Sequence, residues 1–228
     1  MPVDRTETFV LANAAILFGL GVFLSFVNHD YFHSVYTAED GLLEWLTVLA
    51  LGSVAVLLAG RLWKYRHLLN WRQRSILAAL SVLATFGAGE EISWGQRLLA
   101  IDSSEFFLSH NNQQEINLHN LAVGGVSINK DIFSKGILLL FVLYLGLIKP
   151  LYHASAFARR LLDAWGIPIP KRYQYLGYLL VIAVVEGLVN MATGAPRRGE
   201  LTEFSITILA ALNLIYPLHQ PEDTLSRQ

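Results

Sequence analysis

The apolar residues of the chain are grouped in six blocks, which polar connections of unequal charge separate. The blocks cover residues 9–27, 41–60, 75–94, 132–148, 173–191 and 200–216. A helix crosses the ~30 Å hydrocarbon layer of a bilayer with about 20 apolar residues. The pattern therefore predicts an all-α fold, a polytopic transmembrane bundle of about six spans that forms a single membrane domain over residues 1–228. No small-residue cleavage site follows the first block, so we expect a retained helix rather than a signal peptide.

The charge of the connections predicts the orientation of this bundle. The second connection, residues 61–74, and the fourth, residues 149–172, each carry five Lys or Arg residues, whereas the first carries none. Lys and Arg accumulate in cytoplasmic loops, so we expect these two connections and both termini to face the cytoplasm. Residues 101–131 then form an extracytoplasmic polar segment, which we interpret as a candidate lid. Arg197 and Arg198 in the fifth connection run against the pattern.

The composition agrees with a membrane protein and excludes several kinds of chemistry. Hydrophobic residues make up 54% of the chain and charged residues 15%, against about 25% charged residues in soluble domains. The absence of cysteine from the sequence excludes disulfides, thiolate nucleophiles and cysteine-ligated metals. A formal net charge of −1 gives no general attraction to nucleic acid. The sequence also contains no phosphate-binding loop, dinucleotide fingerprint or His-Glu-x-x-His motif.

Glutamates recur near the predicted outer ends of four of the blocks. They are Glu44, Glu90, Glu91, Glu186 and Glu203. With a rise of ~1.5 Å per helical residue, they lie at a similar depth in the outer part of the membrane. An unpaired ionised carboxylate is costly there, so such groups point into the bundle and find partners or protons. We therefore predict that they meet in one site, with Glu44, Glu186 and Glu203 as buried acids around it.

The stretch from Gly87 to Arg97 concentrates this polar chemistry. If it is helical, Glu90, Trp94 and Arg97 share one face, because they are spaced i, i+4 and i+7. Glu115 and His119 are four residues apart, and a short helix would present them together as metal ligands or an acid–base pair. We expect the catalytic residues to be Glu90, Glu91, Glu115, His119 and Arg97.

Other polar residues near this stretch suit substrate binding or metal ligation. The predicted substrate-binding residues are Trp94, Gln96, Asn117, Asn120, Arg197 and Arg198. A divalent metal is one option, with Glu91, Glu115 and His119 as its ligands, since carboxylates and imidazole suit a metal that activates water. Plainer interpretations stay open. The acids and arginines could form a buried ion-pair network, Glu44 could complement a helix dipole, and His119 could be a surface loop residue.

Three segments of the sequence together resemble a family of uncharacterised bacterial polytopic inner-membrane proteins. They are Glu39-Asp40…Glu44-Trp45, the string Gly89-Glu-Glu-Ile-Ser-Trp-Gly-Gln-Arg97, and Asn117-Leu-His-Asn120. The resemblance covers residues 39–120 and implies a bacterial inner-membrane protein, but no activity. The chain is also loosely similar to the membrane hydrolases that include alkaline ceramidases, which hold zinc with histidines. It departs from them by fewer predicted spans and by lacking His-x-x-x-His in a late helix.

Three functions are compatible with these features. The leading hypothesis is a membrane-embedded enzyme, such as a hydrolase, that acts on a lipid or lipid-linked substrate at the outer leaflet. The second is a non-catalytic subunit or assembly factor that binds partner subunits in a larger membrane complex. The third is an ion-coupled transporter. Carboxylate and imidazole atoms within reach of one metal ion would favour the enzyme, whereas dispersed acids that are each paired with an arginine would favour the structural role.

Overall fold

The structure, a computed structural model, describes residues 4–118, 120–123, 126–127, 139–140, 143–195 and 197–219. In this part of the chain nearly all regular structure is helical, which confirms the predicted all-α class. The long helices are α1 (Arg5–Val27), α3 (Leu42–Tyr65), α4 (Trp71–Glu91), α10 (Arg172–Ile182) and α12 (Arg198–Ile215). The π-helical η5 (Ala183–Val189) and α11 (Asn190–Thr193) continue α10 without a break.

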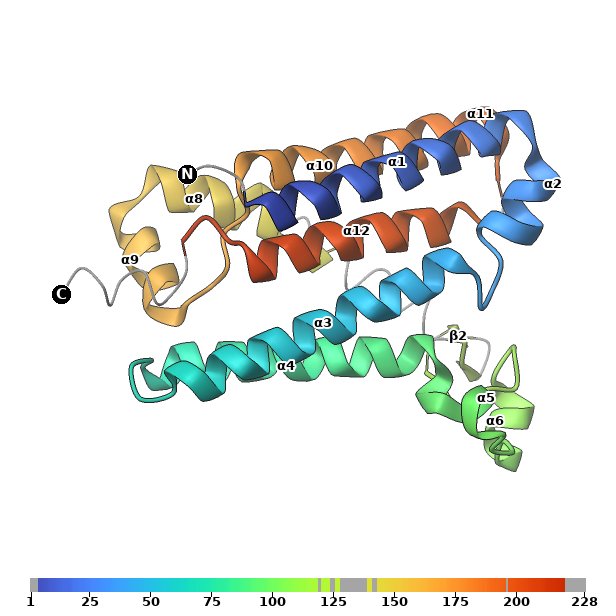
Figure 1. Cartoon of the computed structure of the whole chain (residues 1–228), viewed down its shortest axis with the longest axis horizontal. Coiled ribbons are helices and arrows are strands. Elements are labelled where there is room, and N and C mark those ends of the chain that lie inside the picture. The colour runs from blue at the N-terminus through green and yellow to red at the C-terminus, as the bar shows by residue number, and fades with distance from the viewer. Residues whose placement is uncertain are drawn as a thin grey trace.

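Shorter elements lie at the two ends of the long helices (Figure 1). One end carries α2 (His29–Tyr31), η1 (Phe32–Tyr36), η2 (Ser93–Gly95), α5 (Gln96–Leu99), α6 (Glu105–His110) and the two-residue strands β1 (Ala122–Val123) and β2 (Val126–Ser127). The strands pair antiparallel, with Ala122 opposite Ser127. The other end carries α8 (Lys149–Ala154) and α9 (Ala156–Trp165), which follow η4 (Tyr144–Ile148).

The long helices form two layers that meet at α12 (Figure 1). Helices α1 and α10 lie beside α12 in one layer, and the α3–α4 hairpin forms the other. Helix α12 packs against α1, α3 and α10, so it is the central helix of the described bundle. One core cluster, around Phe32, Tyr178 and Phe204, fills the first layer. A second cluster, around Leu58 and Leu77, joins the hairpin to the end of α12.

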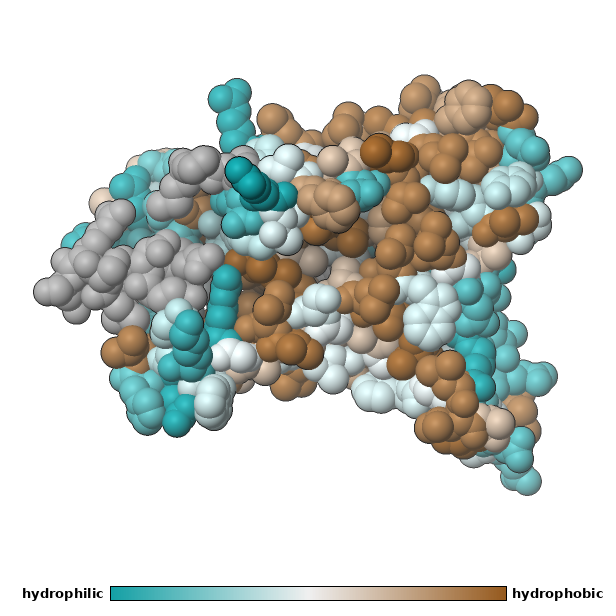
Figure 2. All heavy atoms as spheres, in the orientation of Figure 1, coloured by the Kyte–Doolittle hydropathy of each residue, from teal (hydrophilic) through white to brown (hydrophobic). Residues whose placement is uncertain are grey.

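Three of the described helices are long and apolar enough to cross a membrane. They are Arg5–Val27, Leu42–Tyr65 and Arg172–Thr193, and Trp71–Glu91 with Ser93–Leu99 makes a fourth if this pair, bent by 67°, counts as one span. Large apolar side chains on the outside of α1 are exposed. Phe9 is 69% exposed and Ile16 is 68% exposed, as expected for a surface that faces lipid. Figure 2 shows apolar side chains over the middle of the visible face, between more hydrophilic ends.

The other three predicted blocks agree with the described helices only in part. Block 200–216 forms α12, whose first two turns carry Arg198, Glu200 and Glu203. Most of block 132–148 lies outside the described residues, although its end is helical in η4. Block 75–94 forms α4 only as far as Glu91, so the helical interpretation of the whole stretch from Gly87 to Arg97 is wrong.

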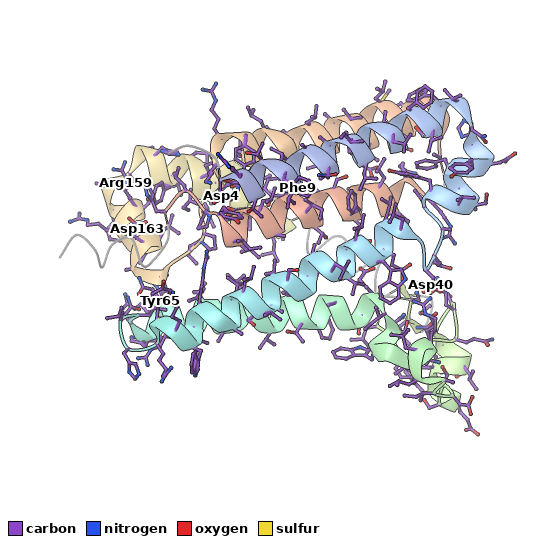
Figure 3. All side chains as sticks on the ribbon, viewed as in Figure 1. Asp4, Phe9, Asp40, Tyr65, Arg159 and Asp163 are labelled. Carbon is purple, nitrogen blue, oxygen red and sulfur yellow. The ribbon has the colours of Figure 1, made fainter. Side chains whose placement is uncertain are left out.

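The two ends of the bundle differ in charge. Figure 3 places Arg159 and Asp163 at the end opposite to Asp40. At the Arg159 end the guanidinium of Arg72 lies over the rings of both Trp71 and Trp165, at 5.6 and 5.4 Å from their centroids. This end of the bundle thus brings a basic side chain together with two aromatic rings.

Gly21 allows the close approach of α1 to α12 and η1. A Cβ atom at Gly21 would lie 2.8 Å from Leu201 Cδ1 and 2.9 Å from Tyr36 Cε1. The Tyr36 hydroxyl donates a hydrogen bond to the Leu17 carbonyl at 2.6 Å, and burial raises the pKa of Tyr36 to about 12. The neutral phenol therefore acts as a permanent donor that holds η1 against α1.

This packing predicts different effects of the same substitution at two glycines of α1. Gly21→Val should lower the free energy of unfolding by about 1–3 kcal/mol, because added atoms in a packed core force neighbours apart. Gly19→Val is the matched control, since a Cβ at Gly19 meets nothing within 4 Å. Thermal unfolding of the two purified variants in detergent measures the difference, and an equal loss in both would contradict the packing.

Candidate functional site

The chain turns sharply directly after the acidic end of α4. Ser93, Trp94 and Gly95 have φ values of 47°, 55° and 79°, so three consecutive residues are left-handed. This conformation costs a non-glycine residue roughly 1–2 kcal/mol, and it is maintained only where the surroundings fix it. The turn sends α5 off at 67° to α4. The expected common helix face of Glu90, Trp94 and Arg97 is therefore wrong, since Arg97 lies beyond the turn.

The ring of Trp94 folds back over α4 and secures this turn. A Cβ atom at Gly89 would lie 2.9 Å from the Trp94 ring, so glycine gives the ring its space. The indole also packs edge-to-face against Phe86, with ring centroids 5.6 Å apart. Trp94 Nε1 donates to Glu90 Oε1 at 2.7 Å. The i, i+4 contact between these two residues thus forms, although the helix has ended between them.

Residues 96–118 and 120–121, which we call the cap, fold back over the end of α4 through hydrogen bonds to the stretch from Gly87 to Arg97. The second carboxylate oxygen of Glu90 accepts the backbone N–H of Leu118 at 2.6 Å. Gln96 accepts the backbone N–H of Ile116 at 2.6 Å and donates to Ser103 Oγ at 2.7 Å. Glu90 and Gln96 therefore hold the segment of the cap that contains Ile116 and Leu118 against the turn.

Two buried amides organise the interior of the cap. Asn111 is 4% exposed and Asn117 is 3% exposed. Asn111 Nδ2 donates to Asn117 Oδ1 at 2.9 Å, and Asn111 Oδ1 accepts the backbone N–H groups of Gln113 and Glu115. Asn117 Nδ2 donates to Ser93 Oγ at 2.8 Å. Buried amides need such complete pairing, so this network fixes the shape of the cap.

The network of the cap presents the carboxylate of Glu115 to the helical bundle. Its Oε2 accepts hydrogen bonds from Ser93 Oγ at 2.5 Å and from Asn117 Nδ2 at 2.9 Å. Its Oε1 lies 3.3 Å from Arg97 Nη1. The predicted short helix with His119 is wrong for the described part, since residues 112–118 form turns and bends. His119 itself lies outside the described residues.

Arg97 joins three carboxylates from different segments. Its Nη1 lies 2.6 Å from Asp40 Oδ2, in the loop before α3, and 3.3 Å from Glu115 Oε1 in the cap. Its Nη2 lies 3.2 Å from Glu44 Oε1 in the first turn of α3. A guanidinium has five N–H donors in a planar fork, which allows this threefold contact. Arg97 therefore ties the cap to α3.

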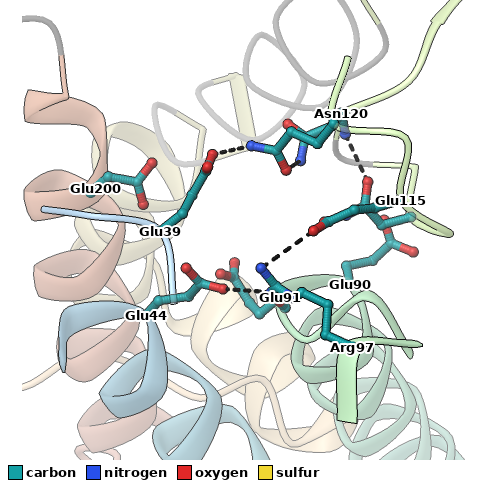
Figure 4. Close-up of a pocket in the computed structure, with 10 residues that line it drawn as sticks. Glu39, Glu44, Glu90, Glu91, Arg97, Glu115, Asn120 and Glu200 are labelled. Carbon is teal, nitrogen blue, oxygen red and sulfur yellow. Dashed lines mark hydrogen bonds and ion pairs between the residues drawn. The ribbon is translucent and has the colours of Figure 1, made fainter. Parts of the chain in front are cut away.

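The cap, α3, α4 and α12 enclose an acidic cavity (Figure 4). Its volume is about 430 Å³, part of which is open to solvent. The lining residues are Glu39, Glu44, Glu90, Glu91, Arg97, Gln113, Glu115, Asn117, Asn120 and Glu200. Figure 4 shows Glu39 and Glu200 on one side and Arg97 with Glu115 on the other. The described part of the lining thus contains six carboxyl groups and one guanidinium.

The acids of the cavity fall into two groups. Glu44 and Glu115 are paired with Arg97, and Glu39 lies 3.4 Å from Arg197. In contrast, the carboxyl group of Glu91 lies close to that of Glu203, a neighbour on α12 that is not among the lining residues. Among the residues that the structure describes, no Lys or Arg side chain is ion-paired with Glu91, Glu200 or Glu203. Glu91 and Glu200, which line the cavity, are available for a ligand, and Glu203 is a neighbour with which Glu91 can exchange a proton.

A groove lies beside the cavity and shares its wall. It is lined by Asp40, Glu44, Trp45, Val48, Ile92, Arg97 and Leu98, with a volume of about 280 Å³ that includes open solvent. Glu44 and Arg97 line both spaces. The groove therefore has a charged end at the cavity and an apolar side formed by α3 and the turn after α4. The exposed side chains of Leu98, at 65%, and Leu99, at 70%, extend this apolar surface.

The predicted site residues occupy several different places. Glu90, Glu91, Glu115, Arg97, Asn117 and Asn120 line the cavity, whereas Trp94 and Gln96 build the cap. Arg198 pairs with Glu186 at 3.3 Å, and the Glu186 side chain is 45% exposed, so Glu186 is outside the cavity and is not a buried acid. Within the described part of the chain no three His, Asp or Glu side chains are arranged to hold a metal ion.

Sequence reasoning missed several residues of the site. Glu39, Gln113 and Glu200 line the cavity, and Asp40 pairs with Arg97. Glu39 and Asp40 belong to one of the three segments that carry the family resemblance. That resemblance was the one sequence feature that connected them with the site. Glu200 lies one turn before Glu203 on α12, so the depth argument could have included it. Gln113 belongs to the amide-rich run between residues 111 and 120, which did not distinguish it from its neighbours.

Comparison with known proteins adds no assignment. No protein-family model, no curated protein and no solved structure matches this chain. The function therefore has to be argued from the cavity and the groove.

Proposed function

We propose that the chain is an integral inner-membrane protein of a bacterium, with six spans, both termini in the cytoplasm and the cap on the outer side. The proposal is supported by the three described helices that are long and apolar enough to span a membrane. It is also supported by the unequal distribution of Lys and Arg over the connections. In this orientation the acidic cavity opens at the outer leaflet.

The orientation predicts which introduced cysteines react from outside the cell membrane. The chain contains no cysteine, so a single introduced one is the only target for a maleimide. A membrane-impermeant maleimide should label Asp102→Cys in right-side-out spheroplasts, and His67→Cys only after permeabilisation. Both residues are exposed. Labelling of His67→Cys in intact spheroplasts would contradict the orientation.

We further propose that the protein is an enzyme that acts on a lipid or lipid-linked substrate at the outer leaflet. One observation carries this proposal, namely that an apolar groove and a polar cavity share Glu44 and Arg97 as lining residues. A lipid has the same two-part chemistry, so its chain suits the groove while its headgroup lies in the cavity. Pockets with a few convergent polar groups beside apolar walls are the usual form of a small-molecule site.

Within this function the residues have distinct roles. Glu91 and Glu203 are the acid–base pair, because one carboxyl group can donate a proton while its neighbour accepts one. Arg97 positions Glu44 and Glu115 and forms the boundary between groove and cavity. Glu90, Gln96, Asn111 and Asn117 hold the cap in place. The proposed enzyme thus uses the acids that the arginines leave uncompensated.

The enzyme proposal predicts lipid turnover that depends on Glu91. Wild-type protein in proteoliposomes of bacterial polar lipids should change the mass of at least one lipid class, followed by mass spectrometry. Glu91→Gln should slow this turnover by about 10²–10⁴-fold, the usual contribution of a general acid or base. Glu186→Gln is the control, because it makes the same change in charge at an acid outside the cavity. If wild-type protein alters no lipid, the enzyme proposal fails.

A second candidate, a non-catalytic subunit of a membrane complex, is favoured by a different observation. Asp40, Glu44 and Glu115 pair with Arg97, and Glu39 and Glu186 pair with Arg197 and Arg198. Such pairing is expected of a network that fixes the shape of a docking surface. The three acids without an arginine partner are what this candidate leaves unexplained, and for that reason we place it second.

A further inference from the structure

The charge of the cavity restricts the headgroup that the proposed lipid site accepts. Among the residues that the structure describes, six glutamates and one arginine line the cavity, which gives this lining a formal charge of −5 if all are ionised. Arg197 also lies nearby, but its guanidinium is already paired with the carboxylate of Glu39. Protons shared between neighbouring carboxyl groups offset part of this negative charge, and a bound cation would offset more of it, because uncompensated charges in a partly buried site are costly. An anionic headgroup would increase the imbalance.

Arg97 does not change this conclusion. Its two terminal nitrogens contact Asp40, Glu44 and Glu115, at 2.6, 3.2 and 3.3 Å, and Nη2 also donates to the Glu91 carbonyl at 3.4 Å. An isolated phosphate would therefore compete with three carboxylates for the guanidinium. The charge of the lining therefore favours a cation over an anion.

The lining also selects between kinds of cation. Quaternary ammonium groups cannot donate hydrogen bonds and are recognised by aromatic rings. The described lining of the cavity consists of Glu, Arg, Gln and Asn side chains and contains no aromatic ring. A primary ammonium has three N–H donors, which match the carboxylate oxygens of Glu44, Glu91 and Glu200.

The groove identifies the source of this ammonium as a lipid rather than a soluble amine. Trp45, Val48, Ile92 and Leu98 give it an apolar side, and it meets the cavity at Glu44 and Arg97. A soluble amine would leave that apolar surface uncovered, whereas a hydrocarbon chain covers it. The Trp45 side chain, 40% exposed, lies along this route.

We propose that the site binds a membrane lipid with a primary ammonium headgroup, whose chain lies along Trp45, Val48 and Ile92 and whose ammonium is held by Glu44 and Glu91. This inference rests on the lipid site proposed above and specifies its substrate class. It needs neither a metal ion nor a cofactor.

Competitive lipid binding tests the inference. Full-length protein in detergent is mixed with equal amounts of phosphatidylethanolamine, phosphatidylcholine and phosphatidylglycerol of the same chains, and native mass spectrometry counts the retained lipids. Wild-type protein should retain the ethanolamine lipid about tenfold over the other two, the scale of one charge-assisted hydrogen bond. Glu91→Gln should lose most of this preference, and Glu186→Gln should keep it. Free ethanolamine should displace little of the lipid, because it lacks the chain.

Two further outcomes separate the inference from the function on which it rests. Val48→Trp, which fills the groove, should reduce retention of all three lipids. Equal retention of the three by wild-type protein, with loss in Val48→Trp, would overturn the ammonium preference and leave the lipid site standing. Preference for the choline or glycerol lipid would also overturn it. If wild-type protein retains no lipid, and Val48→Trp changes nothing, both the inference and the lipid site fail. Thermal unfolding of each variant shows that it is folded.

Discussion

The site depends on the contact of one guanidinium with three carboxylates. Arg97 meets Asp40 before α3, Glu44 within α3 and Glu115 in the cap, so it joins segments that are far apart in the sequence. Without this cation the three acids would repel one another at this end of the bundle. Exposed ion pairs contribute little to stability, but the side chains of Glu44 and Glu115 are only 13% and 14% exposed. Their pairing therefore fixes the wall between the cavity and the groove.

Arg97 reaches this position because the chain turns directly after α4. The left-handed turn at Ser93, Trp94 and Gly95 is held by the indole against Gly89 and by Glu90, which bonds both Trp94 and Leu118. Most residues between Gly87 and Arg97 thus hold the turn and the cap in place, and only some of them face the cavity. Strain that the surroundings maintain is common at functional sites. Here it places Glu91 on the last turn of α4, opposite Glu203 on α12.

The sequence predicts the helical class and most of the long helices, because apolar blocks of this length have few other stable forms. It also predicts that acids meet at one end, since depth along a helix follows from residue number. It could not predict the turn after Glu91, because the string from Glu90 to Arg97 contains no proline and reads as amphipathic helix. The partners of Arg97 were equally hidden, since Asp40 and Glu115 approach it only after the cap folds back. Glu186 was misplaced because depth does not determine which way a side chain points.

A double-mutant cycle between Arg97 and Glu115 tests the central claim, that their contact holds the cap on the bundle. Hydrogen exchange at the backbone amides of Ile116 and Leu118 reports the opening of the cap, since these amides donate to Gln96 and Glu90. The effects of Arg97→Gln and Glu115→Gln on the opening free energy should be coupled by about 1 kcal/mol, as for residues in one charged network. Effects that add within ~0.3 kcal/mol would show that the two residues act independently and would contradict the account.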